Sequence, residues 1–407
     1  IRAMLGELAE EGLLGGAENA TRVQLLTGSM GAQARREALT LIASGMAGIV
    51  VGTHALLEDV VSFADLGLVV IDEQHRFGVE QRDALRAKGE HPPHLLVMTA
   101  TPIPRTVALT VFGDMATSTL RELPRGRQPV TTHVVPVDNA RWVERTWARV
   151  AEEVAAGRQA YVVCPRIGGE DDAADDGVDL VSATDLGDDD ADGERVPEDE
   201  ASERRLADVA GTLELLSAVP ALSGVRMAAL HGRMRPEEKD EVMARFSAGE
   251  LDVLVSTTVI EVGVDVPNAS AMVILDADRF GISQLHQLRG RVGRGGHPGV
   301  CLLLTGSDAD SARERLDALA ATTDGFELAR LDLAQRREGD VLGTAQSGVR
   351  SQLRHLSLLR DEEIIEQARE DVDAVLTADP DLSDHPDLAA ALERLAEEER
   401  AAYLEKS

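Results

Sequence analysis

The chain has 407 residues, of which 43% are hydrophobic and only 2% aromatic, so it can form two or three domains with mostly aliphatic cores. Its net charge of −31 excludes a uniformly basic surface for nucleic acid. Two segments, 168–204 and 361–407, carry −26 of that charge. The other residues are therefore nearly neutral and can form local basic patches.

The cysteines and the apolar runs favour a cytoplasmic protein. Cys164 and Cys301, the two cysteines, each lie in an apolar run, which predicts buried thiols rather than a disulfide framework or a metal site. No apolar run approaches the 18 residues of a membrane-spanning helix. The sequence shows no signal-peptide pattern at Ile1, so we expect a cytoplasmic protein that does not contact a membrane.

Short apolar runs alternate with helical patterns in the first third of the chain. After a helical pattern over 1–15, strands are predicted at 23–26, 48–51, 68–71 and 95–99, with a helix at 32–45. This alternation predicts a parallel sheet. The run 68–71 is rich in Val and Ile, so we expect a strand that is buried on both faces.

A second α/β domain is predicted after the proline-rich segment 124–129. Its expected strands are 130–137, 159–165, 225–230, 251–256, 271–276 and 300–304, and its expected helices are 141–156, 205–222, 236–247 and 283–293. The acidic segment 168–204 contains few large apolar residues, so we expect a disordered insert without a catalytic role. From Ser311 onward the pattern is mostly helical.

Two adjacent carboxylates, Asp72 and Glu73, follow the apolar run 68–71. The carboxyl ends of parallel strands are where open α/β sheets bind their ligands. Asp72 is therefore a candidate for holding Mg²⁺ on a nucleotide phosphate, as in the Walker-B arrangement of nucleotide hydrolases. The alternative is a strand that ends in a solvated acidic turn.

The most specific signal is the segment 287–294, QLRGRVGR, which matches Q-x-x-G-R-x-G-R. Arg291 and Arg294 are three residues apart and project from the same side if the helix continues through them. Arginine grips phosphate oxygens in bidentate fashion and stabilises transition-state charge in nucleoside triphosphate hydrolysis. The alternative is a basic surface turn.

Hydroxyl and glycine residues follow several other predicted strands. Thr257 and Thr258 can bond a DNA phosphate, and Gly263 and Asp265 can approach the nucleotide. Further residues of this kind at strand ends are Thr27, Gly28, Thr53, His54 and His231, which suit a phosphate backbone but also suit ordinary turns. Thr99 and Thr101 would lie beside Asp72 if their strands are neighbours.

In chain order, the segments around Asp72, Thr99, Thr257 and Arg291 match motifs II, III, V and VI of superfamily-two helicases. More narrowly, 52–57 (GTHALL), 72–78 (DEQHRFG), 98–106 (MTATPIPRT) and 113–130 resemble the RecG family of bacterial DNA helicases. The segment 322–348 resembles the translocation motif that this family shares with the transcription-repair coupling factor Mfd. It departs from the usual Arg-Gly-Pro-Gly at 336–339 (RREG), which puts that local turn in doubt.

The resemblance implies an α/β fold with two RecA-like parallel-sheet domains and a mostly helical C-terminal region. It implies a first RecA-like domain over 1–128, lacking its N-terminal part, and a second over 129–308 that contains the acidic insert. The translocation motif and the helical region occupy 309–407.

The resemblance also implies residue roles, with ATP and Mg²⁺ as cofactors. Catalysis falls to Asp72, Glu73, Arg291 and Arg294, with Mg²⁺ held by Asp72 through water. Nucleotide binding adds Gly263, Asp265 and Gln287. Coupling of the nucleotide to movement falls to His75, Thr99, Thr101, Arg336 and Gln346. The DNA-contacting residues are Thr27, Gly28, Thr53, His54, His231, Thr257 and Thr258.

The implied activity is that of an ATP-dependent helicase or translocase on branched double-stranded DNA, such as forks and Holliday junctions. A monomer is expected, and single-stranded-DNA-binding protein is a candidate partner. The sequence contains no G-x-x-x-x-G-K-[ST], the motif that holds the β- and γ-phosphates. We therefore expect this polypeptide to be a fragment that alone hydrolyses little ATP. The alternatives are an Mfd-type translocase, or a catalytically dead remnant that binds DNA or a partner.

Overall fold

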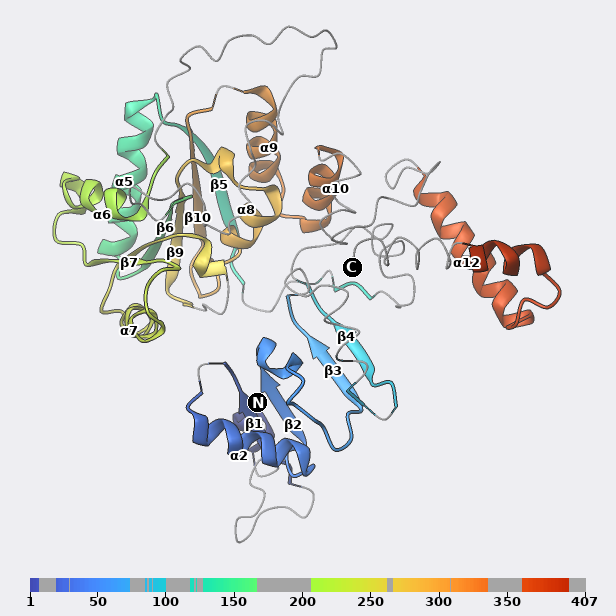
Figure 1. Ribbon diagram of the computed structural model, residues 1–407. Helices are drawn as coiled ribbons and strands as arrows, with labels where there is room; N and C mark the ends of the chain where they lie inside the picture. Colours follow the sequence, from blue (N-terminus) through green and yellow to red (C-terminus); the bar gives the residue numbers. More distant parts are fainter. Residues whose placement is uncertain are drawn as a thin grey trace, which may run out of the picture. The chain divides into compact units, whose positions relative to one another are not determined.

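The computed structural model of the chain describes residues 1–6, 20–28, 30–73, 85, 88–89, 91–99, 118–120, 122, 127–166, 206–261, 266–307, 309–335 and 361–394. The described elements fall into two compact units (Figure 1). The first holds the short helix α1 (Arg2–Leu5) and all elements up to β4, and the second holds those from β5 onward. The predicted insert 168–204 lies outside the described residues.

The first unit contains two pairs of parallel strands. Strand β1 (Val23–Leu26) pairs with β2 (Ile49–Gly52), and β3 (Leu68–Ile71) pairs with β4 (His94–Val97). Helix α2 (Ala32–Ala43) and the 3₁₀ turn η2 (His54–Leu57) accompany the first pair. The predicted parallel pairing of these strands is confirmed.

Strand β3 is not buried on both faces, so that expectation was wrong. Leu68 and Val70 are 58% and 52% exposed, whereas Ile71 is 3% exposed. Leu96 on the neighbouring β4 is also half exposed. Successive side chains of a strand point to opposite faces, so one face of the β3–β4 pair is apolar and open in this structure.

The second unit is built on a six-stranded parallel sheet with the order β5-β10-β9-β6-β8-β7. Its strands are β5 (Val130–Pro136), β6 (Gln159–Val163), β7 (Met227–Leu230), β8 (Val253–Ser256), β9 (Ala269–Ile274) and β10 (Gly299–Thr305). Its helices are α5 (Ala140–Ala155), α6 (Val209–Ser217), α7 (Pro236–Ser247), α8 (Ile282–Arg289), α9 (Asp310–Ala321) and α10 (Gly325–Gln335), with 3₁₀ turns η5 (Pro220–Leu222), η6 (Thr258–Glu261) and η7 (Ala277–Arg279).

Helices cover both faces of this sheet, as Figure 1 shows for α5 and α6 on one side and α8 and α9 on the other. The alternation along β6 makes this possible, since Ala160 and Val162 join the core under α5 and α6, while Tyr161 and Val163 join the core under α7 to α10. Each fully buried large apolar side chain stabilises the fold by about 1.5–3 kcal/mol. The predicted second α/β domain is therefore confirmed.

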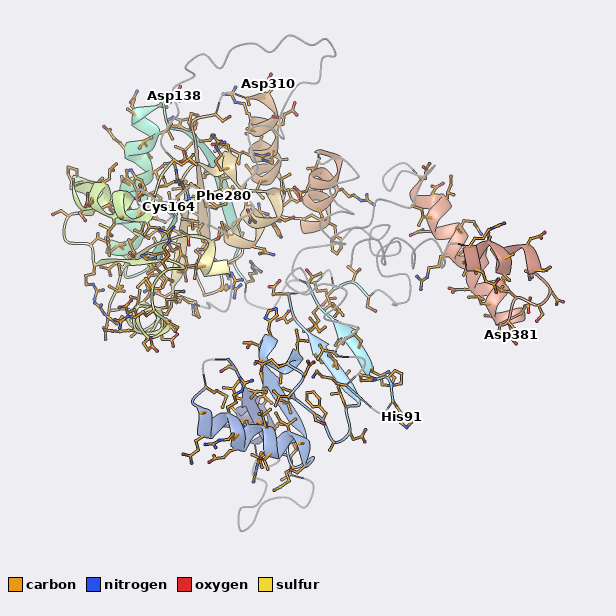
Figure 2. The ribbon with its side chains drawn as sticks, in the orientation of Figure 1. His91, Asp138, Cys164, Phe280, Asp310 and Asp381 are labelled. Carbon is orange, nitrogen blue, oxygen red and sulfur yellow. The ribbon has the colours of Figure 1, made fainter. Side chains whose placement is uncertain are left out.

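Both cysteines are buried free thiols, as the sequence predicts. Cys164 and Phe280, marked in Figure 2, lie within the body of the second unit. Burial raises the pKa of each thiol, Cys164 and Cys301, to about 12. On α5, Trp147 is buried and Val143 packs partly against the same core, whereas Trp142 is 53% exposed.

The C-terminal part is helical where the structure describes it, in agreement with the sequence pattern. Helix α12 (Glu362–Ala378) follows the segment that connects it to α10. Asp379 then accepts hydrogen bonds from the backbone N–H groups of Ser383 and Asp384, both at 2.8 Å, which closes the turn after the helix. Among the described helices, none combines the length and apolar character needed to cross a membrane.

Arg166 and Asp208, described residues before and after the acidic insert, lie side by side. Arg166 and Asp208 form an isolated parallel β-bridge, and the Val209 N–H donates to the Arg166 carbonyl at 3.1 Å. The Ala207 N–H donates to Asp276 Oδ2 at 2.8 Å, which ties the re-entry of the chain to the end of β9. The chain therefore leaves and re-enters the fold at one place.

Replacing residues 168–204 with a short Gly-Ser linker should leave the second unit folded. Loop-closure free energy changes by about 0.6 kcal/mol for each halving of loop length, and this replacement is two or three halvings, about 1–2 kcal/mol, so we expect a shift in thermal midpoint of at most about 7 °C. Circular dichroism melting of the chain measures it. Deletion of 209–217, which removes the buried face of α6, is the matched control and should unfold the unit. Loss of folding in the insert deletion itself would show that the insert stabilises the domain.

Candidate functional site

The carboxylates Asp72 and Glu73 lie directly after β3, next to the end of β4. The last registered pair is Ile71 with Val97, and the Met98 N–H donates to the Ile71 carbonyl at 2.8 Å. Asp72 and Glu73 therefore follow β3 at the sheet edge where Met98 and Thr99 follow β4, although the two segments are more than 20 positions apart in the sequence.

Local geometry fixes the turn that carries the carboxylates. Asp72 Oδ1 accepts a hydrogen bond from the Glu73 N–H at 2.9 Å. Glu73 has φ of 55°, in the left-handed region that non-glycine residues adopt uncommonly. Such conformations cost about 1–3 kcal/mol and cluster at ligand and active sites. The strand thus ends abruptly at two acidic residues, and Asp72 is exposed.

The residues after β1 and β2 form a second group in the first unit. The register pairs Leu26 with Gly52, so Thr27 and Gly28 lie at the same edge as Thr53 and His54. A Cβ added to Gly52 would lie 2.3 Å from the Leu26 carbonyl oxygen, so only glycine permits this close approach. The structure thus places the four residues at one edge of the β1–β2 pair, and Gly28, Thr53 and His54 are exposed.

In the second unit, His231, Thr257 and Thr258 follow the paired strands β7 and β8. The Thr257 N–H donates to the Leu230 carbonyl at 3.3 Å, which joins the two strand ends. Burial, followed by the charges of Lys239 and Arg233, lowers the pKa of His231, so its imidazole is neutral at pH 7. Thr257 is only 4% exposed, whereas Thr258 begins the half-exposed turn η6.

Helix α8 carries Gln287 but ends before the two predicted arginines. Its last residue is Arg289, and Gly290 is the C-cap. Gly293 has φ of 73°, so the expectation of a helix through 293 was wrong, because a left-handed residue cannot continue a right-handed helix. Arg291 and Arg294 instead lie in a turn, in which Arg294 Nε donates to the Gly290 carbonyl at 3.0 Å. Helix α8, which precedes this turn, packs against η6, the segment that begins at Thr258.

Six predicted site residues lie outside the described part of the chain: His75, Thr101, Gly263, Asp265, Arg336 and Gln346. Their roles stay predictions. The described site residues include two carboxylates and several hydroxyls in the first unit, and two arginines and two hydroxyls in the second. Acidic residues suit a metal-bound nucleotide, and guanidinium groups suit its phosphates.

Three helicase family profiles match the chain in order. The DEAD/DEAH box helicase profile matches 10–110, the helicase conserved C-terminal domain profile matches 201–296, and the profile of ATP-dependent DNA helicase RecG, domain 3, C-terminal, matches 322–403. The ATP-dependent DNA helicase RecG of Mycobacterium tuberculosis (strain ATCC 25618 / H37Rv) is 56% identical over 411 residues, covering 100% of this chain and 52% of the relative. The same helicase of Mycobacterium leprae (strain TN) is 53% identical over 412 residues with the same coverage.

The chain belongs to the RecG family. It spans about half the length of the curated RecG relatives that it matches. A solved structure of RecG bound to a three-way DNA junction aligns with a TM-score of 0.57 and 34% identity, over 90% of this chain and 41% of that chain. The two parallel-sheet units are thus RecA-like helicase domains, in agreement with the predicted fold class.

The residues present fit the cofactors of a RecG-type helicase. An exposed aspartate at the end of a parallel strand offers the oxygen ligand that Mg²⁺ accepts alongside water and phosphate. Asp72 would hold this ion, and Glu73 lies next to it in the same turn. When bound, Mg²⁺ neutralises the charge that develops on the phosphates.

Sequence reasoning missed Arg289, the arginine that lies within the most specific motif but points into the core. Its side chain is 3% exposed and donates to the carbonyls of Leu319 at 2.5 Å and Thr322 at 2.8 Å, at the end of α9. The sequence does contain a signal for this burial. Ile282, Leu285 and Arg289 occupy positions i, i+3 and i+7, which share one helix face. That face is apolar and buried, so Arg289 had to be buried with it.

His286 accepts a hydrogen bond from Arg289 in this cluster. Arg289 Nη2 lies 2.7 Å from His286 Nδ1, and because a guanidinium only donates, Nδ1 is the acceptor and the proton of the neutral ring is on Nε2. Burial, and then the charges of Arg289 and Arg127, lower the pKa of His286 to about 4. The ring is therefore neutral at pH 7.

The free energy of unfolding should decrease as the pH falls from 6.5 towards 4. In that window the unfolded chain protonates His286 while the folded chain does not, so protons favour the unfolded state. Denaturant unfolding as a function of pH measures this slope, and His286→Gln, which keeps an acceptor without titrating, should reduce it. The exposed His297→Gln is the control. A His286 ring signal that titrates near pH 6.5 by NMR would contradict the burial described here.

Proposed function

We propose that this chain supplies ATP-hydrolysing and duplex-translocating parts of a RecG-type DNA helicase that acts on branched DNA. The observation that carries the proposal is the placement of Asp72 and Glu73 at the carboxyl end of β3, at the sheet edge where Thr99 follows the neighbouring strand β4. In a parallel sheet this edge is the ligand-binding edge. The turn after α8 carries Arg291 and Arg294, whose guanidinium groups suit nucleotide phosphates.

In the proposed reaction Asp72 holds Mg²⁺ through its water shell. Glu73 orients the attacking water and accepts its proton, and Arg291 and Arg294 stabilise the charge on the transferred phosphoryl group. Gln287, Gly263 and Asp265 complete the nucleotide contacts. His75, Thr99, Thr101, Arg336 and Gln346 couple hydrolysis to movement of the duplex.

The proposed DNA contacts come from strand ends in both units. They are Thr27, Gly28, Thr53, His54, His231, Thr257 and Thr258. The closeness of the first four to one another supports this assignment, since their exposed N–H and hydroxyl groups suit a phosphate backbone. The buried Thr257 fits a supporting role for Thr258 better than a direct contact.

The solved RecG complex with a three-way junction supports branched DNA as the substrate class. The proposed domain boundaries are 1–128, 129–308 and 309–407. A monomeric enzyme in the cytoplasm, with single-stranded-DNA-binding protein as a further partner, completes the proposal. The sequence has no G-x-x-x-x-G-K-[ST], so the 407-residue polypeptide by itself should hydrolyse little ATP.

Substitutions in the complete reading frame that contains this chain test the proposed roles. Glu73→Gln should lower kcat for DNA-stimulated ATP hydrolysis by about 10²–10⁴-fold, because it removes the proton acceptor. Arg291→Ala should lower kcat by up to about 10³–10⁵-fold, the range for a transition-state arginine. Both variants should still bind a three-way junction in a gel-shift assay.

Asp59→Asn is a matched control, because this carboxylate is exposed in the same unit and lies away from the strand end. Its kcat should equal that of the parent protein. Hydrolysis by Glu73→Gln at the parent rate would remove the proposed general base. DNA-stimulated turnover by residues 1–407 alone, at the rate of the complete protein, would refute the expectation of an inactive fragment.

A further inference from the structure

The segment 127–129, which precedes β5, lies against the arginine turn 290–294. Two hydrogen bonds join them. Arg127 Nη2 donates to the Gly290 carbonyl at 3.0 Å, and the Gln128 N–H donates to the Gly293 carbonyl at 3.1 Å. In addition, the N–H of Gly299, the first residue of β10, donates to the Pro129 carbonyl at 2.9 Å. These contacts connect positions more than 160 residues apart.

The turn is shaped to accept this segment. A Cβ on Gly293, whose φ is 73°, would lie 2.8 Å from Val130 Cγ2 and 3.0 Å from the Gln128 carbonyl oxygen. A Cβ on Gly290 would lie 3.3 Å from Arg127 Nη2. Any side chain at position 293 would therefore push the segment away. The two glycines of the G-R-x-G-R pattern leave room for the backbone of 127–130 as well as forming the turn itself.

Two guanidinium groups share one carbonyl at this contact. Arg127 and Arg294 both donate to the oxygen of Gly290, each at 3.0 Å. Burial, and then the charge of Arg294, lower the pKa of Arg127, so bringing these cations together has a free-energy cost. The cost is smaller when an anion lies beside them, and the phosphates of a nucleotide are such an anion under the proposed function.

Along the chain, residues 127–129 lie between β4, in the first unit, and β5, in the second. The hydrogen bonds of Arg127 and Gln128 end on the carbonyls of Gly290 and Gly293, which flank Arg291.

We infer that Arg127 is a positioning residue for Arg291 and Arg294. It fixes the Gly290 carbonyl and, together with the Gln128 N–H, sets the backbone of the arginine turn. Arg127 was not among the residues expected to act in hydrolysis. The role of Arg291 and Arg294 in this inference rests on the proposed function. The contact between 127–129 and the arginine turn is independent of that function.

Kinetics of Arg127→Ala and Arg127→Lys in the complete reading frame test this role. Misplacing a catalytic group by about 1 Å can cost 10²-fold, so we expect Arg127→Ala to lower kcat for DNA-stimulated ATP hydrolysis roughly 10- to 100-fold. The KM for ATP should change less than about twofold, because Arg127 positions transition-state groups rather than binding the ground state. Arg127→Lys keeps one donor and should lose only about two- to fivefold.

The matched control is Arg141→Ala, which removes an exposed arginine from α5 and should leave kcat unchanged. Wild-type kcat in Arg127→Ala would overturn the inference. So would a lower thermal midpoint in Arg127→Ala without a change in kcat per folded molecule, since that assigns Arg127 to stability alone. If Arg127→Ala does not fold, Arg127→Lys decides, and a parent-like kcat there would also overturn the inference.

Hydrogen–deuterium exchange separates this inference from the proposed function. Arg127→Ala should speed exchange of the Gln128 and Gly299 amides, whose partners lie in the contact. Faster exchange in a protein that hydrolyses no ATP would support the contact while refuting the proposed function. Unchanged exchange of both amides would overturn the inference, whatever the ATPase activity.

Discussion

Parallel strand pairing is the constraint on which the rest of this structure depends. Each of the seven registered strand pairs of the described sheets is parallel, so within each sheet all carboxyl ends face one edge. Residues that follow different strands therefore meet, although tens of positions separate them in sequence. Asp72 and Thr99 follow the paired strands β3 and β4 at one edge in the first unit, and His231 and Thr257 follow β7 and β8 at one edge in the second.

Parallel strands also require covering layers, and the two units differ in this respect. The six-stranded sheet is covered on both faces by amphipathic helices, and its central strands are completely buried. The β3–β4 pair has half-exposed apolar side chains on one face. Exposed apolar area of this kind is stabilised when another layer covers it.

Neighbouring arginines of the motif 287–294 have different roles: one stabilises the fold, and two are proposed to act in hydrolysis. Arg289 is directed into the core, where it binds the carbonyls at the end of α9, while Arg291 and Arg294 follow in a turn that leaves the helix. A buried arginine needs several acceptors to offset the loss of water, and the end of a helix offers unpaired carbonyls. The turn that carries Arg291 and Arg294 is thus held in place by Arg289, which precedes it, and by Arg127, which contacts the Gly290 carbonyl.

The sequence by itself determined the strands, the parallel α/β class, the buried thiols and the family, because apolar periodicity and short motifs are local properties. It also located Asp72, Glu73 and the arginine pair, since their residue types follow strands and glycines in a specific order. Only the tertiary structure decided that α8 ends at Arg289, that Leu68 and Val70 lie exposed, and that Arg127 contacts Gly290. Each of these depends on contacts between distant segments. A side chain's environment is set by what packs against it, which no local pattern contains.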